Sequence, residues 1–273
     1  MVELSIIIVN FETRDLLIGC LNSIEKSDIK TSFEIIVIDN GSSDGSIEGL
    51  KEYRKNHEHL TIIENKSNLG FARASNQGIK YAKGNYTLLL NSDTKVKKNA
   101  INKLLDFAKK TPDLGAVGPK FLNTDGTIQG SIFRLPTLGR AVREYWLGEK
   151  GLLDKYSLEG KNPIPVEALS MACFLITPNC LLKVGFLNER YFMYFEDLDY
   201  CRRIKEKGLK TFYFPEVEIY HYHGASGKKL TEENLQWKRL IPSSKIYHGE
   251  IVHYLITFII KSSQICSKLL KRS

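Results

Sequence analysis

The sequence of 273 residues predicts an α/β fold, in which helices cover both faces of a mostly parallel sheet and a helical tail follows. Two observations carry this prediction. Short apolar runs alternate with helical patterns through the first half of the chain, and the links between them are short. The first run, at residues 4–9, is apolar except for Ser5, which is typical of a strand covered on both faces.

The first half supplies the elements of this alternation in order. Strands are expected at residues 4–9, 35–38, 60–63, 86–90 and 116–117. Helices are expected at residues 13–23, with Thr13 as the cap, at 71–82 and at 99–109, and another begins after the turn residues 39–44. Strands joined through helices in this way pair in parallel, which predicts a doubly wound sheet.

The second half is less regular. The dipeptide Asp125-Gly126 between apolar residues predicts a hairpin that ends near Phe133. A helix is expected at 138–147, a polar loop with two prolines at 155–165, and a return to the sheet at 166–176. A helix at 197–207 that Gly208 closes, and strands at 211–214 and 217–222, complete the expected elements.

Charge divides the chain into a near-neutral body and a basic tail. Residues 228–273 hold nine Lys or Arg and three Glu, so they account for most of the formal charge of +8. We therefore expect a domain at 1–226, with halves at 1–118 and 119–226, and an amphipathic tail at 227–273. A basic tail indicates an anionic partner, either a membrane or a nucleic acid, and the apolar stretch 251–260 suits a membrane surface. The alternative is a helix packed on the domain.

Cysteine usage and hydropathy indicate the cellular compartment of the protein. The five cysteines form no C-x-x-C pair and their number is odd, which favours reduced thiols over zinc or disulfides. No apolar stretch reaches the roughly 18 residues of a membrane span. The apolar run 6–9 is too short for a signal peptide. We expect a cytoplasmic protein that lies peripherally on the inner face of the cell membrane.

Polar residues follow three of the expected strands: Asn10, then Asp39, then Asn91-Ser92-Asp93. Ligands of open α/β sheets bind at the carboxyl ends of strands, so neighbouring strands would gather these residues into one site. Asp39 suits a base imide or a ribose hydroxyl, or merely builds a turn. Asp93 is well placed to hold Mg²⁺ or Mn²⁺, or merely caps a helix.

Two common nucleotide-binding fingerprints are absent. Residues 11–14, Phe-Glu-Thr-Arg, follow the first strand without a glycine, so no G-x-G-x-x-G motif stands there. The chain also lacks G-x-x-x-x-G-K-[ST]. Neither NAD-dependent nor P-loop chemistry is supported.

Acidic residues and histidines mark two further candidate groups. Glu196, Asp197 and Asp199 open an expected helix after the aromatic segment 192–195. The helix dipole favours carboxylates there, but three acids beside an aromatic run are costly if merely structural, so one of them is a credible general base. His221 and His223 lie on one face of an expected strand, as structural residues or as metal ligands.

Taken together, these residues resemble family 2 of the inverting glycosyltransferases, which have the GT-A fold, and in particular its bacterial rhamnosyltransferase-like branch. The matching segments are SIIIVNF at 5–11, VIDNGSSDG at 37–45, NLGFARASNQG at 68–78, LNSD at 90–93, FMYFEDLD at 192–199 and IYHYHGAS at 219–226. Each segment is weak alone, whereas six in the right order form a specific pattern.

The resemblance implies a role for each group of residues. It assigns these residues to the nucleotide-sugar: Val9, Asn10, Phe11, Asp39, Asn68, Arg73, Asn76, Asn91, Ser92 and Asp93. Within this set Asp39 would read a pyrimidine base. Asp93 would be the surviving acid of a D-x-D metal motif in which Asn91 replaces the first aspartate.

The resemblance also assigns the chemistry. Asp197 would be the catalytic base, and Glu196 and Asp199 would shape the acceptor pocket. His221 would join Asp93 as a ligand of Mg²⁺ or Mn²⁺, with His223 as the alternative.

The implied activity is an inverting, metal-dependent hexosyl transfer in cell-surface polysaccharide synthesis. The donor would be a nucleotide-sugar, dTDP-rhamnose first and a UDP-sugar second, and the acceptor a hydroxyl of a glycan or lipid-linked glycan. A sugar-phosphate nucleotidyltransferase would need a glycine-rich basic loop, which residues 11–14 do not supply. A nucleic-acid-binding module would need basic patches on the body, which is close to neutral, so no nucleic-acid partner is expected.

Overall fold

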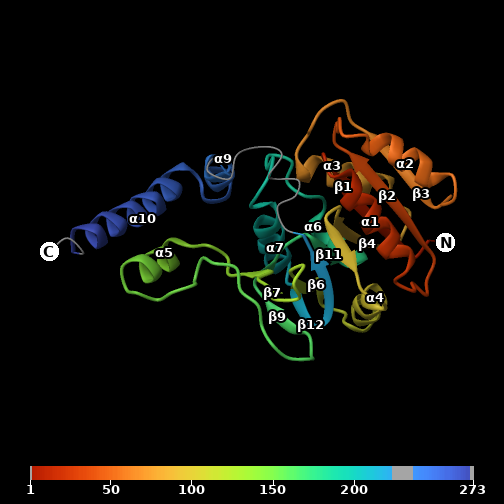
Figure 1. The fold of residues 1–273 in the computed structure, drawn as a ribbon. Coiled ribbons are helices and arrows are strands. Elements are labelled where there is room, and N and C mark those ends of the chain that lie inside the picture. Colours follow the sequence, from red (N-terminus) through yellow and green to blue (C-terminus); the bar gives the residue numbers. More distant parts are fainter. Residues whose placement is uncertain (1, 223–235, 271–273) are drawn as a thin grey trace.

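The computed structural model describes residues 2–222 and 236–270. Its main sheet has the strand order β3-β2-β1-β4-β11-β6-β12-β5 (Figure 1). The strands are β1 (Leu4–Asn10), β2 (Phe33–Asp39), β3 (Leu60–Glu64), β4 (Tyr86–Asn91), β5 (Thr94–Val96), β6 (Leu114–Leu122), β7 (Ile128–Gln129), β8 (Ile132–Phe133), β9 (Ile164–Val166), β10 (Ala168–Leu169), β11 (Cys173–Ile176) and β12 (Lys210–His221).

Helices flank this sheet and extend beyond it. They are α1 (Arg14–Glu25), α2 (Ser46–Arg54), α3 (Phe71–Tyr81), α4 (Ala100–Lys110), α5 (Leu138–Tyr145), α6 (Pro178–Val184), α7 (Glu196–Glu206), α9 (Gln236–His248) and α10 (Glu250–Leu270). Strands β1 to β4 pair in parallel, while β11 runs antiparallel to both β4 and β6. The predicted α/β class with a mostly parallel sheet and a helical C-terminal tail is confirmed.

The apolar character of β1 follows from burial on both of its faces. Ile6 and Ile8 belong to the core beneath α1 and α4, with Leu17 of α1. Ile7, which points the other way, belongs to the core beneath α3 and α7, with Ala74 of α3. Successive strand residues point to opposite faces, so a strand between two helical layers has no polar side.

The pairing register makes the three strands neighbours, which was the condition for their polar ends to form one site. β1 lies between β2 and β4, with Asn10 opposite Asp39 and Val9 opposite Asn91. Three carboxyl ends therefore meet at one edge of the sheet, where ligands of such sheets bind.

Two local expectations were wrong. The strands expected at 211–214 and 217–222 are one strand, β12, which ends at His221 and whose register to β6 shifts between Phe214 and Glu218. Pro215 explains the break in pairing because it has no N–H to donate. The side chain of Thr13 does not cap α1; its hydroxyl bonds to Asn10 and Ser92 instead.

The tail helices pack on the rest of the chain. The Ser243 hydroxyl of α9 donates to the Met193 carbonyl at 2.8 Å, and the Trp146 indole donates to the Ile259 carbonyl of α10 at 3.3 Å. Figure 1 shows α5 and α10 together at the end of the molecule away from β3. None of the described helices combines the length and apolar character that crossing a bilayer requires.

Candidate active site

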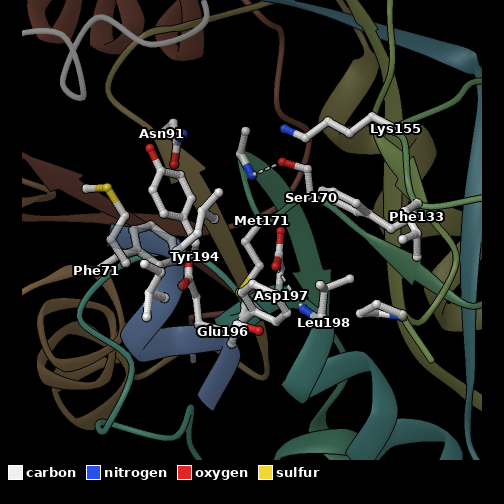
Figure 2. Close-up of a pocket in the computed structure, with 18 of the residues that line it drawn as sticks. Phe71, Asn91, Phe133, Lys155, Ser170, Met171, Tyr194, Glu196, Asp197 and Leu198 are labelled. Carbon is white, nitrogen blue, oxygen red and sulfur yellow. Dashed lines mark hydrogen bonds between the residues drawn. The ribbon is translucent and has the colours of Figure 1, made fainter. Parts of the chain in front are cut away.

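A cavity of about 980 Å³ opens at the carboxyl ends of β1 and β4. Its walls come from the strand ends with the loop at Asn68, from the segments 133–137, 153–155 and 170–172, and from the start of α7 with helices α9 and α10. In Figure 2, Asn91 and Phe71 lie on one side, Phe133 and Lys155 on the other, and Asp197 between them.

A buried hydrogen-bond network joins the three strand ends behind the cavity wall. Asn10 Nδ2 donates to Asp39 Oδ1 at 2.8 Å, and the Ser42 hydroxyl donates to the same oxygen at 2.7 Å. The Thr13 hydroxyl donates to Asn10 Oδ1 at 2.7 Å and lies 2.8 Å from the Ser92 hydroxyl. Asp39 and Asn10 are almost completely buried and do not line the cavity. Their hydrogen bonds set the position of the wall.

The residues that reach the cavity on this side are Val9, Phe11, Asn40, Asn68, Asn91, Ser92 and Asp93. Asn40 Nδ2 donates to Asn68 Oδ1 at 2.9 Å, which ties β2 to the loop before α3. This loop also contacts the segment that precedes α7, because the Phe71 N–H donates to the Phe192 carbonyl oxygen at 2.9 Å. A Cβ at Gly70, where φ is +85°, would clash with the same oxygen. Only a glycine fits such an approach without a shift of the backbone.

Two residues that the resemblance places near the donor lie elsewhere. The Asn76 amide is buried, where it donates to the Leu187 carbonyl at 2.9 Å and accepts from the Leu187 N–H at 3.0 Å. Arg73 is more than half exposed, with its Nε 3.9 Å from Glu189. Both side chains leave α3 on the face turned toward residues 187–189, and neither lines the cavity. Their positions do not support contact with a ribose or diphosphate.

The structure brings Asp93 and His221 together. β5 follows Asp93 and pairs antiparallel with β12, so that His221 lies opposite Thr94. Asp93 Oδ1 is 3.4 Å from His221 Nε2, and both buried side chains line the cavity. His223 lies outside the described residues. Within the described ranges, no three His, Cys, Asp or Glu side chains gather into a metal-binding group.

The acidic segment enters the cavity through an unusual turn. Tyr194 and Phe195 have φ angles of +69° and +68°, a left-handed conformation that costs roughly 1–2 kcal/mol for each residue with a side chain. The turn starts α7 so that Glu196 and Asp197 line the cavity. Such strain is typical of functional sites.

Electrostatics separate the two acids. Burial, and then the nearby charge of Asp197, raise the pKa of Glu196 to about 8. Burial also raises the pKa of Asp197, against the opposing charge of Lys155. Oε2 of Glu196 is buried and has no hydrogen-bond partner within the part of the chain that the structure describes. A charge on Asp197 therefore favours a proton on Glu196, and at neutral pH Glu196 keeps its proton.

Asp199 does not reach the cavity. Its buried carboxylate accepts from Arg202 Nη2 at 2.8 Å and from Arg203 Nε at 3.0 Å, one turn along α7. Both carboxylate oxygens are held by this structural contact. The expectation that Asp199 shapes the acceptor pocket is not supported by its position.

Other cavity residues were not anticipated from the sequence. Lys155 lies across the cavity from Glu196 (Figure 2), and Arg134 lines the same wall. From the tail, His248 and His253 also line it. Lys155 falls in a polar loop and the histidines in an amphipathic tail, so no motif or spacing links them to Asp197. Only the folded chain shows that they share a cavity.

Comparison with known proteins places the chain among sugar-transferring enzymes. Residues 5–168 match the family model described as Glycosyl transferase family 2. The chain is 28% identical over 209 residues to an N-acetylglucosaminyl-diphospho-decaprenol L-rhamnosyltransferase of Mycobacterium tuberculosis, covering 70% of this chain and 67% of that protein. It is 26% identical over 239 residues to the low-salt glycan biosynthesis hexosyltransferase Agl10 of Haloferax volcanii, covering 80% and 67%.

Solved structures show the same fold at low sequence identity. The mannosyltransferase PcManGT from Pyrobaculum calidifontis, in complex with GDP-Man and Mn²⁺, matches with a TM-score of 0.65 and 13% identity over 99% of this chain and 75% of that one. GalNAc-T7 with UDP, GalNAc and Mn²⁺ matches with a TM-score of 0.63 and 18% identity over 81% of this chain and 44% of that one.

Proposed function

This chain belongs to glycosyl transferase family 2 and has its GT-A fold, and from that premise we propose that it moves a hexosyl group from a nucleotide-sugar to an acceptor hydroxyl with inversion of configuration. One observation carries the proposal. A single cavity is lined both by the Asp93–His221 pair and by the Asp197 carboxyl at the start of α7. A leaving diphosphate and an attacking hydroxyl can thus share one space.

The donor side is the wall at the carboxyl ends of β1, β2 and β4. We assign the nucleotide to the wall at Val9, Phe11, Asn40 and Asn68, with Asp39 and Asn10 holding this wall from behind. The relative named as an L-rhamnosyltransferase makes dTDP-rhamnose the first donor to test. The match to a structure that holds UDP makes a UDP-sugar the second.

The residues at Asp93 fit a divalent cation. Asp93 offers a carboxylate oxygen and His221 a ring nitrogen, 3.4 Å apart at the cavity wall. Mg²⁺ is usually held by one or two carboxylates together with substrate phosphates, so the donor diphosphate would complete such a site. When bound, Mg²⁺ or Mn²⁺ stabilises the negative charge on the leaving nucleotide. Two of the similar structures contain Mn²⁺.

The proton chemistry belongs to the start of α7. Asp197 removes the proton from the acceptor hydroxyl as that oxygen attacks the anomeric carbon. The bond from this carbon to the diphosphate oxygen breaks on the opposite face, which inverts the configuration. Glu196 holds its own proton near neutral pH, because burial and Asp197 raise its pKa.

The acceptor side of the cavity includes the tail helices α9 and α10. We assign a lipid-linked glycan at a membrane surface to this side. α10 is apolar on two opposite faces: Ile256 and Ile260 line the cavity, while Phe258 and Ile265 are exposed. Exposed Trp146 lies beside α10 at the end of α5. An exposed apolar stripe with flanking lysines suits a peripheral helix on the anionic inner face of a cell membrane.

A donor screen followed by a transfer assay tests this function. We expect dTDP-rhamnose or a UDP-sugar to raise the melting temperature more in the presence of Mn²⁺ than in its absence. The donor that binds is then incubated with an N-acetylglucosaminyl-diphospho-lipid, and the anomeric configuration of the product is read by NMR. A product with retained configuration refutes the inverting mechanism, and no transfer from any binding donor refutes the proposed activity.

A further inference from the structure

We propose that Gln129 is a positioning residue that fixes the ring tautomer of His221 and so presents the Nε2 lone pair of His221 to a metal ion. This inference rests on the proposed metal site of the transferase. Gln129 lies on β7 and His221 on β12, and β6 runs between these strands. Gln129 Oε1 lies 2.7 Å from His221 Nδ1, on the side of the ring away from Asp93.

The hairpin between β6 and β7 sets the direction of this hydrogen bond. The exposed Asp125 carboxylate can only accept, and its hydrogen bond from the Thr127 hydroxyl, at 2.7 Å, lowers the pKa of Asp125. Because Thr127 has given its proton to Asp125, its oxygen accepts from Asn123 Nδ2 at 2.9 Å. Asn123 then turns its carbonyl oxygen toward Gln129 and accepts from Gln129 Nε2 at 2.9 Å.

A second contact fixes Gln129 in the same orientation. Gln129 Nε2 also lies 3.4 Å from the backbone carbonyl oxygen of His221, which can only accept. Both partners of Nε2 are acceptors, so the amide cannot be turned around without losing two hydrogen bonds. Gln129 Oε1 therefore faces Nδ1 of the ring and must receive its proton.

The consequence falls on the other ring nitrogen. A neutral imidazole carries one proton, so a proton on Nδ1 leaves Nε2 with a lone pair. That lone pair faces Asp93 Oδ1 at 3.4 Å, and two electron-rich atoms at this distance attract a cation. A proton on Nε2 would instead be donated to Asp93 and would leave that nitrogen without a lone pair for a metal. Gln129 thus favours the tautomer in which Nε2 can act as a metal ligand.

The test compares three variants in the metal-free, full-length protein. Gln129→Leu removes the acceptor at similar volume, Gln129→Glu keeps an acceptor oxygen, and Gln77→Leu removes a glutamine that hydrogen-bonds Asn65 outside the cavity. NMR shifts of the ¹⁵N-labelled histidine rings report the tautomer, and electron paramagnetic resonance reports the dissociation constant for Mn²⁺ without donor. Gln129→Met repeats the loss of the acceptor if the leucine variant does not fold.

We expect the proton of His221 on Nδ1 in the wild type, in Gln129→Glu and in Gln77→Leu. In Gln129→Leu it should move to Nε2, and the Mn²⁺ dissociation constant should rise about 10- to 100-fold, as on loss of other residues that orient metal-bound histidines. An unchanged tautomer and Mn²⁺ affinity in Gln129→Leu would overturn the inference. So would a wild-type protein in which Nδ1 of His221 carries no proton. Failure to transfer sugar, by contrast, bears only on the proposed function.

Discussion

Oδ1 of Asp93 lies 3.4 Å from Nε2 of His221, although one residue follows β4 and the other ends β12. The short strand β5 creates this contact, because it pairs with the end of β12 directly after Asp93. The Tyr222 N–H also donates to the Asp93 carbonyl oxygen at 2.8 Å and fixes the backbone there. The two side chains are therefore held in place before any ligand arrives.

Loss of the Asp93 carboxylate should weaken metal binding strongly. We expect Asp93→Asn to weaken Mn²⁺ binding by at least about 100-fold, since it removes the single carboxylate of the proposed pair. Transfer should fall in parallel. Electron paramagnetic resonance titration measures the affinity, and Asp106→Asn, an exposed acid on α4, is the matched control. Full Mn²⁺-dependent turnover by Asp93→Asn would contradict the assignment of Asp93 as a metal ligand.

Substitution of two aspartates of α7 should affect different properties, turnover in one case and stability in the other. Asp197→Asn should lower kcat by about 10²- to 10⁴-fold, the usual contribution of a general base, with donor affinity nearly intact. Asp199→Asn should instead lower stability by about 1–3 kcal/mol, because it weakens charged hydrogen bonds from Arg202 and Arg203. Steady-state kinetics, donor titration and urea unfolding separate the two effects. Normal turnover by Asp197→Asn would exclude it as the base.

The raised pKa of Glu196 predicts how stability depends on pH. The folded protein holds this proton up to about pH 8, whereas the ordinary value is 4.5. The stabilisation from the protonated form is therefore complete below about pH 4.5 and is lost as the pH rises through 8. We expect Glu196→Gln, which stays neutral, to gain several degrees of melting temperature over the wild type between pH 5 and pH 9. Glu58→Gln, at an exposed position, is the control. If the difference in melting temperature between Glu196→Gln and the wild type changed with pH no more than it does for Glu58→Gln, the assignment would be contradicted.

The exposed face of α10 should decide membrane contact. Phe258→Ser removes a large exposed apolar side chain from this face, and Leu182→Ser removes one from α6, elsewhere on the surface. We expect only the α10 variant to lower binding to anionic vesicles, by several-fold, because interfacial helices bind through buried apolar area. Vesicle co-sedimentation measures the difference. Equal vesicle binding by both variants and the wild type would exclude this face of α10 as the membrane-contact surface.

The sequence was most informative where local pattern and topology agree. Alternating strands and helices predicted a parallel sheet with a site at the strand ends if the strands ending at Asn10, Asp39 and Asn91 were neighbours. The structure makes β1, β2 and β4 neighbours. A cavity opens at these ends, and Asp93, Asp197 and His221 line it. Parallel strands have their carboxyl ends at one edge, so this part of the site follows from strand order alone.

Residue type did not reveal which polar groups serve packing. Asn76 and Asp199 lie within the motifs, yet their side chains bind Leu187 and two arginines. A helix pattern gives the buried face but not the partner that will cover it. Lys155 lines the cavity but was not predicted, because it lies outside every motif. Its loop carries no periodic signal and approaches Asp197 only through tertiary packing.

The cavity is built from two stretches of chain that follow one another in sequence. Its strand-end wall comes from residues before Thr94, and its other walls come from residues after Ile132. The family match ends at residue 168, before Asp197 and His221. Under the proposed function, relatives can therefore share the strand-end wall while the later walls diverge, and a new acceptor can be acquired in evolution without rebuilding the wall assigned to the nucleotide.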